Sequence, residues 1–332
     1  MQQATTSEAP ALAPGGGRLG MLQRLFFRFA GIGPLLILLC VVIAVMNPVF
    51  LSFQNWVNLL NSVAAIWIMA MAMTMVLLTA GFDLSVGSML ALSGVGMVNM
   101  MSAGVPEIPA ILLTLAAAAL IGGLTNGLLI GRMGLNFFVV TLGTMTLYRG
   151  IVYVWTNGQT LYASDYRLVQ WIGNGKVGPI PVTILLMGLV FLAVWLMLRY
   201  TNYGRSIYVV GGNPTAARLA GMNVSLILIS VYALAAMFAG LAGIVETGRL
   251  ASASPTVGMS TELLVAAAVL LGGTSFRGGE GGVAGTALGV LFIAVLQNGL
   301  GLSGISSYWQ NVITGVILIF AIMLNHFKSK RG

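Results

Sequence analysis

Long apolar stretches with almost no charge constrain this chain more than any other feature. Between Arg28 and Arg132 the only fully charged side chains are Asp83 and Glu107. An α-helix needs about 20 apolar residues to cross the hydrocarbon core of a bilayer, so this stretch alone has room for several crossings. Only 7% of the 332 residues are charged and 58% are hydrophobic, which is too little polar surface for a water-soluble fold. The sequence therefore predicts an all-α polytopic membrane protein that has lipid as a partner.

Turn residues and charges divide the apolar sequence into separate expected spans. The span at 262–273 is short and ends at two glycines, so we expect it to cross only in part, which is tolerated where the backbone packs on protein or lines a cavity. Ten transmembrane helices are expected, at about 32–49, 57–79, 84–103, 109–131, 137–156, 181–199, 225–247, 262–273, 283–302 and 308–325.

The basic residues predict the orientation, because cytoplasmic loops collect Lys and Arg. With both termini in the cytoplasm, most basic residues fall on the inner side, and Arg167, Lys176 and Arg249 fall in outer loops. Residues 1–28 are polar and rich in Gly and Pro, and we expect a disordered cytoplasmic tail there. Residues 29–327 are expected to form a single transmembrane domain, and residues 328–332 a cytoplasmic C-terminal tail.

A short repeated string suggests internal symmetry. Asn126-Gly127-Leu128, near the end of the fourth span, recurs as Asn298-Gly299-Leu300 near the end of the ninth. These spans run in opposite directions, as an inverted-topology repeat predicts, with spans two to five answering spans seven to ten. Three-residue strings also recur by chance in a chain rich in Gly and Leu, so both interpretations stay open.

Several function classes lack their required residues. The only cysteine is Cys40 and the only histidine is His326, so we expect no disulfide, metal site or histidine-based catalytic site. The sequence has no P-loop, since Gly175-Lys176 follows no glycine-rich cradle, and the chain is not expected to hydrolyse ATP. The basic residues are dispersed rather than clustered, so no nucleic acid partner is expected.

The longest inner loop, at about 200–224, is the most polar stretch outside the N-terminal tail. Within it Asn213 can cap a helix, Pro214 suits the first helical position and Gly221 can end the helix. A helix from Pro214 to Ala220 is too short to be stable alone, so it must pack against something. Composition by itself also allows an ordinary surface loop.

Five sequence blocks, in order, resemble the ribose-type branch of the bacterial ABC-importer permeases, the inner-membrane components of binding-protein-dependent transport systems. The resemblance covers most of the chain after residue 34. The blocks are TAGFDLSVGSMLALSG (79–94), FFVVTLGTMTLYRGIVYVWTNG (137–158), TNYGRSIYVVGGNPTAARLAGMN (201–223), SASPTVGMSTELLVAAAVLLGGTSFRGGEGGVAGTALG (252–289) and NGLGLSGISSYWQNVITGVILIFAI (298–322).

The resemblance implies a permease subunit that moves a monosaccharide across the bacterial inner membrane, with a ten-helix fold similar to that of the vitamin B12 importers. It implies three protein partners: a cytoplasmic ABC ATPase that binds the ATP, a periplasmic sugar-binding protein, and a second permease copy or close paralogue. No cofactor is implied for this chain. Family members often have Glu where this chain has Pro214, which leaves the capping geometry open. The residues implied to couple to the ATPase are Gly212, Asn213, Ala216, Ala217, Arg218 and Gly221.

Polar residues at the expected pore helices are candidates for the translocation path. Asp83 and Glu262 each have a second interpretation, because a carboxylate near a helix start is also favoured as a cap or by the helix dipole. Arg167 and Lys176 in the outer loop are candidates for docking an acidic binding-protein rim, although the loop can also be merely solvated. The path candidates are Asp83, Ser85, Asn136, Thr141, Thr144, Glu262, Tyr308, Trp309 and Gln310.

The main alternative function is a secondary transporter driven by an ion gradient. Such carriers use buried ionisable residues for coupling, and Asp83, Arg149, Glu246 and Glu262 are candidates for that role. A coupling-type inner loop argues against it, because an ion-driven carrier has no need of one. A membrane scaffold without transport activity is a third possibility.

Overall fold

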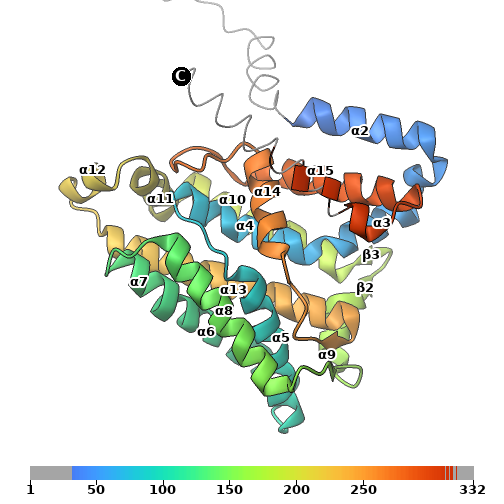
Figure 1. Cartoon of the computed structure of the whole chain (residues 1–332), viewed down its shortest axis with the longest axis horizontal. Helices are drawn as coiled ribbons and strands as arrows, with labels where there is room; N and C mark the ends of the chain where they lie inside the picture. The colour runs from blue at the N-terminus through green and yellow to red at the C-terminus, as the bar shows by residue number, and fades with distance from the viewer. Residues whose placement is uncertain (1–31, 311, 314, 317–318, 320–332) are drawn as a thin grey trace, which may run out of the picture.

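The computed structural model describes residues 32–310, 312–313, 315–316 and 319. The predicted tails at 1–28 and 328–332 lie outside the described residues, as does much of the predicted tenth span. Figure 1 shows an assembly of helices, which confirms the all-α prediction. The few strands are two-residue pairs: β1 (Leu161–Tyr162) with β4 (Ser252–Ala253), and β2 (Lys176–Val177) with β3 (Ile180–Pro181).

The helices follow the predicted spans closely. The first half contains α2 (Gly33–Met46), the 3-10 helix η1 (Pro48–Leu51), α3 (Phe53–Ser62), α4 (Ala64–Leu78), α5 (Val86–Ser102), α6 (Glu107–Gly122), the π-helix η2 (Gly123–Gly127), α7 (Leu128–Gly131) and α8 (Phe137–Thr156). The second half contains α9 (Arg167–Asn174), α10 (Val182–Tyr200), α11 (Asn202–Gly212), α12 (Pro214–Leu219), α13 (Val224–Leu250), α14 (Thr261–Leu271) and α15 (Val283–Leu302).

Five helical segments of the described chain are long and apolar enough to cross a membrane: Glu107–Gly131, α8, α10, α13 and α15. The pair α3–α4 adds a sixth if it counts as one span, but it is bent by 52°. The expected span at 57–79 is thus not a straight helix, because the chain bends at Val63 between α3 and α4. The expected eighth span is a short apolar helix, since α14 has 11 residues. The chain is a multi-pass membrane protein, and the count of ten spans stays a prediction.

Two helices form the centre of the molecule (Figure 1). Helix α4 is fully buried from Ile68 to Leu78, as expected for a helix that is apolar all round. Helix α13 packs against α4, α5 and α6, and small residues allow the close approach. A Cβ on Gly243 would lie 2.3 Å from the Leu90 carbonyl oxygen. Such close approach of helix backbones at small residues is typical of membrane proteins.

Each half of the chain contributes a central helix that packs against helices of the other half. Helix α13, the seventh span, contacts α5 and α6 of the first half, and α4 of the second span contacts α14 and α15 of the second half. Helices α4 and α13 also contact each other. An inverted repeat that relates spans two to five to spans seven to ten predicts this pattern, so the packing favours the repeat over chance recurrence of the Asn-Gly-Leu string.

Candidate functional site

A buried polar network surrounds Asp83 in the turn between α4 and α5. The Asp83 Oδ1 accepts hydrogen bonds from the Ser85 backbone N–H at 2.8 Å and from the Ser85 Oγ at 2.6 Å. The Asn126 Nδ2 donates to the Ser85 Oγ at 2.9 Å and to Asp83 Oδ1 at 3.3 Å. The Thr144 Oγ1 of α8 donates to the Asn126 Oδ1 at 2.7 Å. Three predicted path residues, Asp83, Ser85 and Thr144, are thus brought together.

The geometry around Asp83 favours the structural interpretation of this residue. Its carboxylate accepts the N–H of Ser85, which is the N-cap residue of α5, and so closes the turn at the start of that helix. Asp83 is 1% exposed, so a solute cannot reach the carboxylate in this conformation. A carboxylate buried in a membrane protein needs such partners, because an unpaired charge there is costly.

Asn126 joins the network, although the sequence pointed to it only as part of a repeated string. It lies in η2, a five-residue π-helical stretch between α6 and α7, and such stretches often occur at functional sites. The neighbouring Thr125 Oγ1 lies 2.5 Å from the Tyr148 hydroxyl of α8. A Cβ on Gly127 would lie 2.9 Å from the Ile229 Cα. The stretch therefore packs on α13 while its polar side chains face α5 and α8.

A second group of charged residues lies at the start of α14. The Arg149 Nη1 donates to the carbonyl oxygens of Pro255, at 2.5 Å, and Val257, at 2.8 Å, and its Nη2 donates to that of Gly87 at 3.2 Å. Glu262 lies in the first turn of α14 and is 9% exposed. A Cβ on Gly87 would lie 2.4 Å from the Glu262 Oε2. Arg149 thus holds α8, α5 and the loop before α14 together.

The remaining path candidates lie at other positions. Asn136 is exposed and caps α8, since its Oδ1 accepts the Phe138 N–H at 2.8 Å. Thr141 is buried one turn before Thr144, and its hydroxyl donates to the Phe137 carbonyl. The last three candidates follow α15: Tyr308 is 82% exposed, Trp309 is 63% exposed, and the Gln310 side chain donates to the Ile305 carbonyl.

The loop at about 200–224, predicted to lie on the inner side, forms two short helices, α11 and α12. The Asn213 Oδ1 accepts the Ala216 N–H at 2.9 Å, and Pro214 takes the first helical position. The departure at Pro214 therefore leaves the cap intact. Gly221 has a φ of +80° and its N–H donates to the Arg218 carbonyl at 2.9 Å, which ends the segment as predicted. Helix α12 ends at Leu219, one residue earlier than expected.

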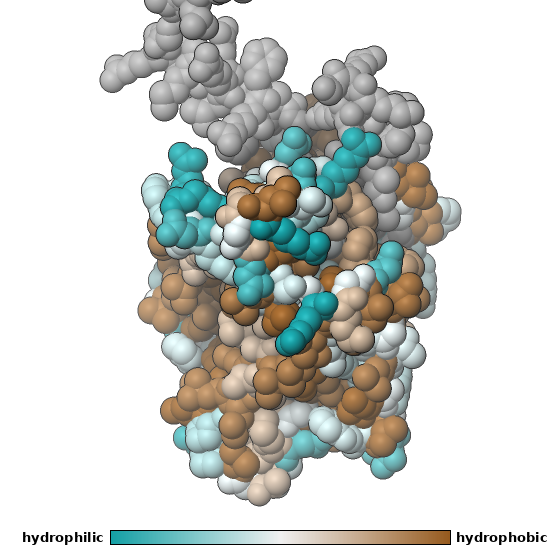
Figure 2. Space-filling view, turned by 90° about the vertical axis from the view of Figure 1, so that its left-hand side faces the viewer, coloured by the Kyte–Doolittle hydropathy of each residue, from teal (hydrophilic) through white to brown (hydrophobic). Residues whose placement is uncertain are grey.

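The two faces of α12 differ. Ala217 is fully buried and packs with Val210 of α11 and Val224 of α13, so it faces the chain's own helices. The other predicted coupling residues are exposed. Leu219 is 86% exposed, although no pattern in the sequence pointed to it. Figure 2 looks onto the α12 side of the molecule, where hydrophilic side chains gather in the upper half of the view.

A hydrogen bond between the Tyr203 side chain of α11 and the Ser230 side chain of α13 joins these two helices. The Tyr203 hydroxyl lies 2.7 Å from the Ser230 Oγ. Burial raises the pKa of the Tyr203 phenol, and the Ser230 hydrogen bond, which lowers it, is the smaller effect. The phenol therefore stays neutral at physiological pH and keeps its role as a hydrogen-bonding partner.

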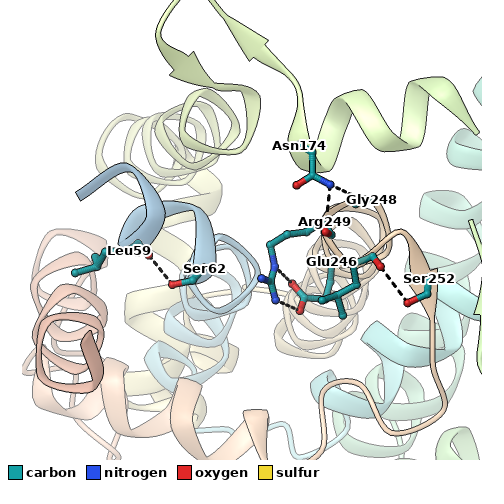
Figure 3. A network of polar contacts seen from close by, with 8 residues as sticks. Leu59, Ser62, Asn174, Glu246, Gly248, Arg249 and Ser252 are labelled. Carbon is teal, nitrogen blue, oxygen red and sulfur yellow. Dashed lines mark hydrogen bonds and ion pairs between the residues drawn. The ribbon is translucent and has the colours of Figure 1, made fainter. Parts of the chain in front are cut away.

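The loop that contains α9 packs on the opposite end of α13. The Glu107 Oε2 accepts the backbone N–H groups of Leu168, at 2.7 Å, and Val169, at 3.0 Å, at the start of α9. The Asn174 Nδ2 donates to the Gly248 carbonyl at 2.8 Å. Nearby, Arg249 and Glu246 form a salt bridge, in which the Arg249 Nη2 lies 2.5 Å from the Glu246 Oε1 (Figure 3).

Both predicted docking residues, Arg167 and Lys176, are exposed on this loop. A short connection joins the end of α12 to the first turn of α13, whereas α9 packs on the last turn of α13. A helix of 27 residues is about 40 Å long, close to the thickness of a bilayer with its headgroups. The coupling candidates and the docking candidates therefore lie at opposite ends of a membrane-length helix.

Comparisons with known proteins agree with these features. Residues 55–322 match the family described as branched-chain amino acid transport system / permease component. The chain is 42% identical to the ribose import permease protein RbsC of Escherichia coli (strain K12) over 297 residues, which cover 89% of this chain and 92% of that protein. It is 41% identical to RbsC of Bacillus subtilis (strain 168) over 314 residues, covering 93% and 95%.

A more distant relative is the D-allose transport system permease protein AlsC of Escherichia coli (strain K12), which is 33% identical over 300 residues, or 88% of this chain and 91% of that protein. No solved structure matches, so the likeness to the vitamin B12 importers stays a prediction. The family match spans most of the chain, and several helices are long enough to cross a membrane. The chain therefore belongs to this permease family and is a ribose-type ABC permease.

Proposed function

We propose that this chain imports ribose or a closely similar monosaccharide. The observation that carries the proposal is the 42% identity to a ribose import permease over 89% of the chain. The relative named for allose is 33% identical. The family description names amino acids, but the more similar individual relatives are named for sugars, and this favours a sugar as the substrate.

The chain has the features expected of the membrane-spanning half of the transporter. It lacks a P-loop, so ATP would be bound and hydrolysed by a separate cytoplasmic ATPase. Helix α12 supports this division of work, because it is a short capped helix with Leu219 and Arg218 exposed for a partner. A periplasmic sugar-binding protein would deliver the sugar to the α9 end, where Arg167 and Lys176 are exposed. No cofactor of its own is needed.

Two permease copies, identical or paralogous, would form the conduit between them in the bacterial inner membrane, with both termini in the cytoplasm. ATP-driven closure of the ATPases would draw the two α12 helices together and rock the permeases between outward- and inward-facing forms. The path residues would then lie at three places: α8 and its start, the start of α14, and the segment after α15. They are Asn136, Thr141, Thr144, Glu262, Tyr308, Trp309 and Gln310. Hydroxyl and amide side chains suit a sugar, because weak contacts admit and release it.

The ion-driven alternative gains no support from the charged residues. Arg149 binds three backbone carbonyl groups, Glu246 pairs with Arg249, and Asp83 closes a turn. Each of these three therefore has a structural partner, and the fourth candidate, Glu262, lies in the first turn of α14, where the helix dipole favours a carboxylate without any function.

Reconstitution in proteoliposomes tests the proposal. The permease, the ATPase and the binding protein encoded with it should together take up labelled ribose only when ATP is on the ATPase side. Labelled allose and leucine serve as competing substrates. Uptake by the permease alone under a proton or sodium gradient would contradict the ATP-driven function, and preferential uptake of leucine would contradict the sugar assignment.

A further inference from the structure

The loop between α14 and α15, GGTSFRGGEGG at 272–282, has a defined shape that the proposed function does not yet explain. The Ser275 N–H donates to the Glu280 carbonyl at 3.0 Å, and the Gly278 N–H donates to the Ser275 carbonyl at 3.3 Å. Gly278 and Gly279 have φ values of +78° and +72°, which side chains with a Cβ adopt only with strain. The loop is therefore folded on itself and is not a slack connection.

One side of this loop lies against the end of α11. The Tyr208 hydroxyl donates to the Gly281 carbonyl at 3.1 Å. A Cβ on Gly279 would lie 3.0 Å from the Gly212 Cα, and a Cβ on Gly278 would lie 2.8 Å from the Gly211 carbonyl oxygen. Because α11 and α12 are separated by a single residue, a displacement of α12 acts directly on this contact.

The other side of the loop lies against the end of α4 and the turn that holds Asp83. The Gly279 N–H donates to the Leu78 carbonyl at 2.9 Å. A Cβ on Gly278 would lie 2.7 Å from the Ala80 backbone nitrogen. The Phe276 ring stacks on the Phe82 ring with centroids 5.6 Å apart and planes 29° apart. Phe82 directly precedes Asp83, which is hydrogen-bonded to Ser85 and Asn126.

We propose that the glycine-rich loop 272–282 is a rigid link that carries the movement of α12 to the Asp83 turn, with Phe276 as its positioning residue. Backbone groups touch directly on both sides of the loop, so little side-chain rearrangement can absorb a displacement, and packed interiors switch between arrangements rather than deform smoothly. From the turn, the displacement reaches Asn126 and then Thr144 on α8. This inference rests on the proposed ATP-driven function.

The test measures ribose transported per ATP hydrolysed by the complete complex of permease, ATPase and binding protein in proteoliposomes. We expect Phe276→Ala to lower this ratio by about 5-fold or more, the lower range of typical coupling effects. ATP hydrolysis and the half-saturating concentration of ribose-loaded binding protein should stay unchanged. Phe276→Tyr keeps the ring and should restore the ratio. Glu280→Gln is the matched control, because in the described chain only the backbone of this exposed residue takes part in the loop's hydrogen bonds.

A second variant keeps the test decisive if Phe276→Ala fails to accumulate. Tyr208→Phe removes one hydroxyl and its bond to Gly281, and we expect it to lower the same ratio. A ratio equal to that of the wild type in Tyr208→Phe and in any Phe276→Ala complex that assembles would overturn the rigid link while leaving the proposed function intact. Failure of the wild-type complex to take up ribose with ATP would overturn the proposed function itself.

Discussion

At the scale of single residues, Asn126 links several buried polar groups. It donates to Asp83 and Ser85 and accepts from Thr144 within the interior, so one amide joins three elements. A buried acceptor or donor that loses its partner costs far more than a hydrogen bond contributes net. The sequence showed the amide but not the π-helical turn that directs it inward, since that turn depends on packing against α13.

We predict that Asn126→Ala destabilises the permease by about 1–3 kcal/mol, because the buried Asp83 carboxylate loses the Asn126 donor and the Thr144 hydroxyl keeps only the carbonyl groups of its own helix. The measurement is thermal unfolding of the purified protein in detergent. Thr146→Val is the matched control, since the Thr146 hydroxyl is exposed and donates only to its own helix. Equal unfolding temperatures for the Asn126 variant and the wild type would refute the structural role of the network.

At the scale of elements, substitutions on the two faces of α12 are expected to have different effects. Leu219 is exposed, whereas Ala217 is buried between α11 and α13. An exposed apolar side chain on a short surface helix suits an anchor in a partner's pocket. The resemblance named Ala217 as a coupling residue, and its burial means that it supports the helix from behind.

We predict that Leu219→Ser weakens binding of the ATPase subunit by about 1 kcal/mol or more, the threshold of a significant interface residue, with unchanged permease stability. Ala217→Leu should instead lower permease stability by about 1–3 kcal/mol, because the packed site has no room for the larger side chain. Co-purification and thermal unfolding measure the two effects. An Ala217→Leu protein as stable as the wild type would show that α12 does not pack as described.

At the scale of the whole molecule, glycines set how closely the central helices approach. A Cβ on Gly243 of α13 would lie 2.3 Å from a carbonyl oxygen of α5, whereas Gly143 of α8 has nothing within 4 Å in the described structure. We predict that Gly243→Ala lowers stability by about 1–3 kcal/mol through overpacking, and that Gly143→Ala is tolerated. Membrane yield and unfolding temperature compare the two. The reverse order would contradict the central position of α13.

The whole-molecule arrangement also predicts sidedness. In a Cys40→Ser background, Leu219→Cys should react with a membrane-impermeant maleimide only from the cytoplasmic side, and Tyr162→Cys only from the periplasmic side. Both positions are more than four-fifths exposed in the structure, at 86% and 81%. Labelling of Leu219→Cys from outside intact cells would reverse the proposed orientation and remove α12 from reach of a cytoplasmic ATPase.

The sequence by itself determined the class of the protein, most of its helices and the short helix α12. Apolar length sets which segments can cross a bilayer, and the Asn213 cap and Gly221 terminator act locally, so both could be read from neighbouring residues. Five blocks in order also identified the family without any structure.

Only the tertiary structure decided which polar residues meet. Asn126, Ser85 and Thr144 are far apart in the chain, and Arg149 binds carbonyl groups from two other segments. The π-helical turn likewise packs on α13, and the burial of Ala217 depends on how Val210 of α11 and Val224 of α13 fold back onto α12. Contacts of this kind follow from how α4 and α13 cross and pack, and no local pattern of residues encodes that crossing.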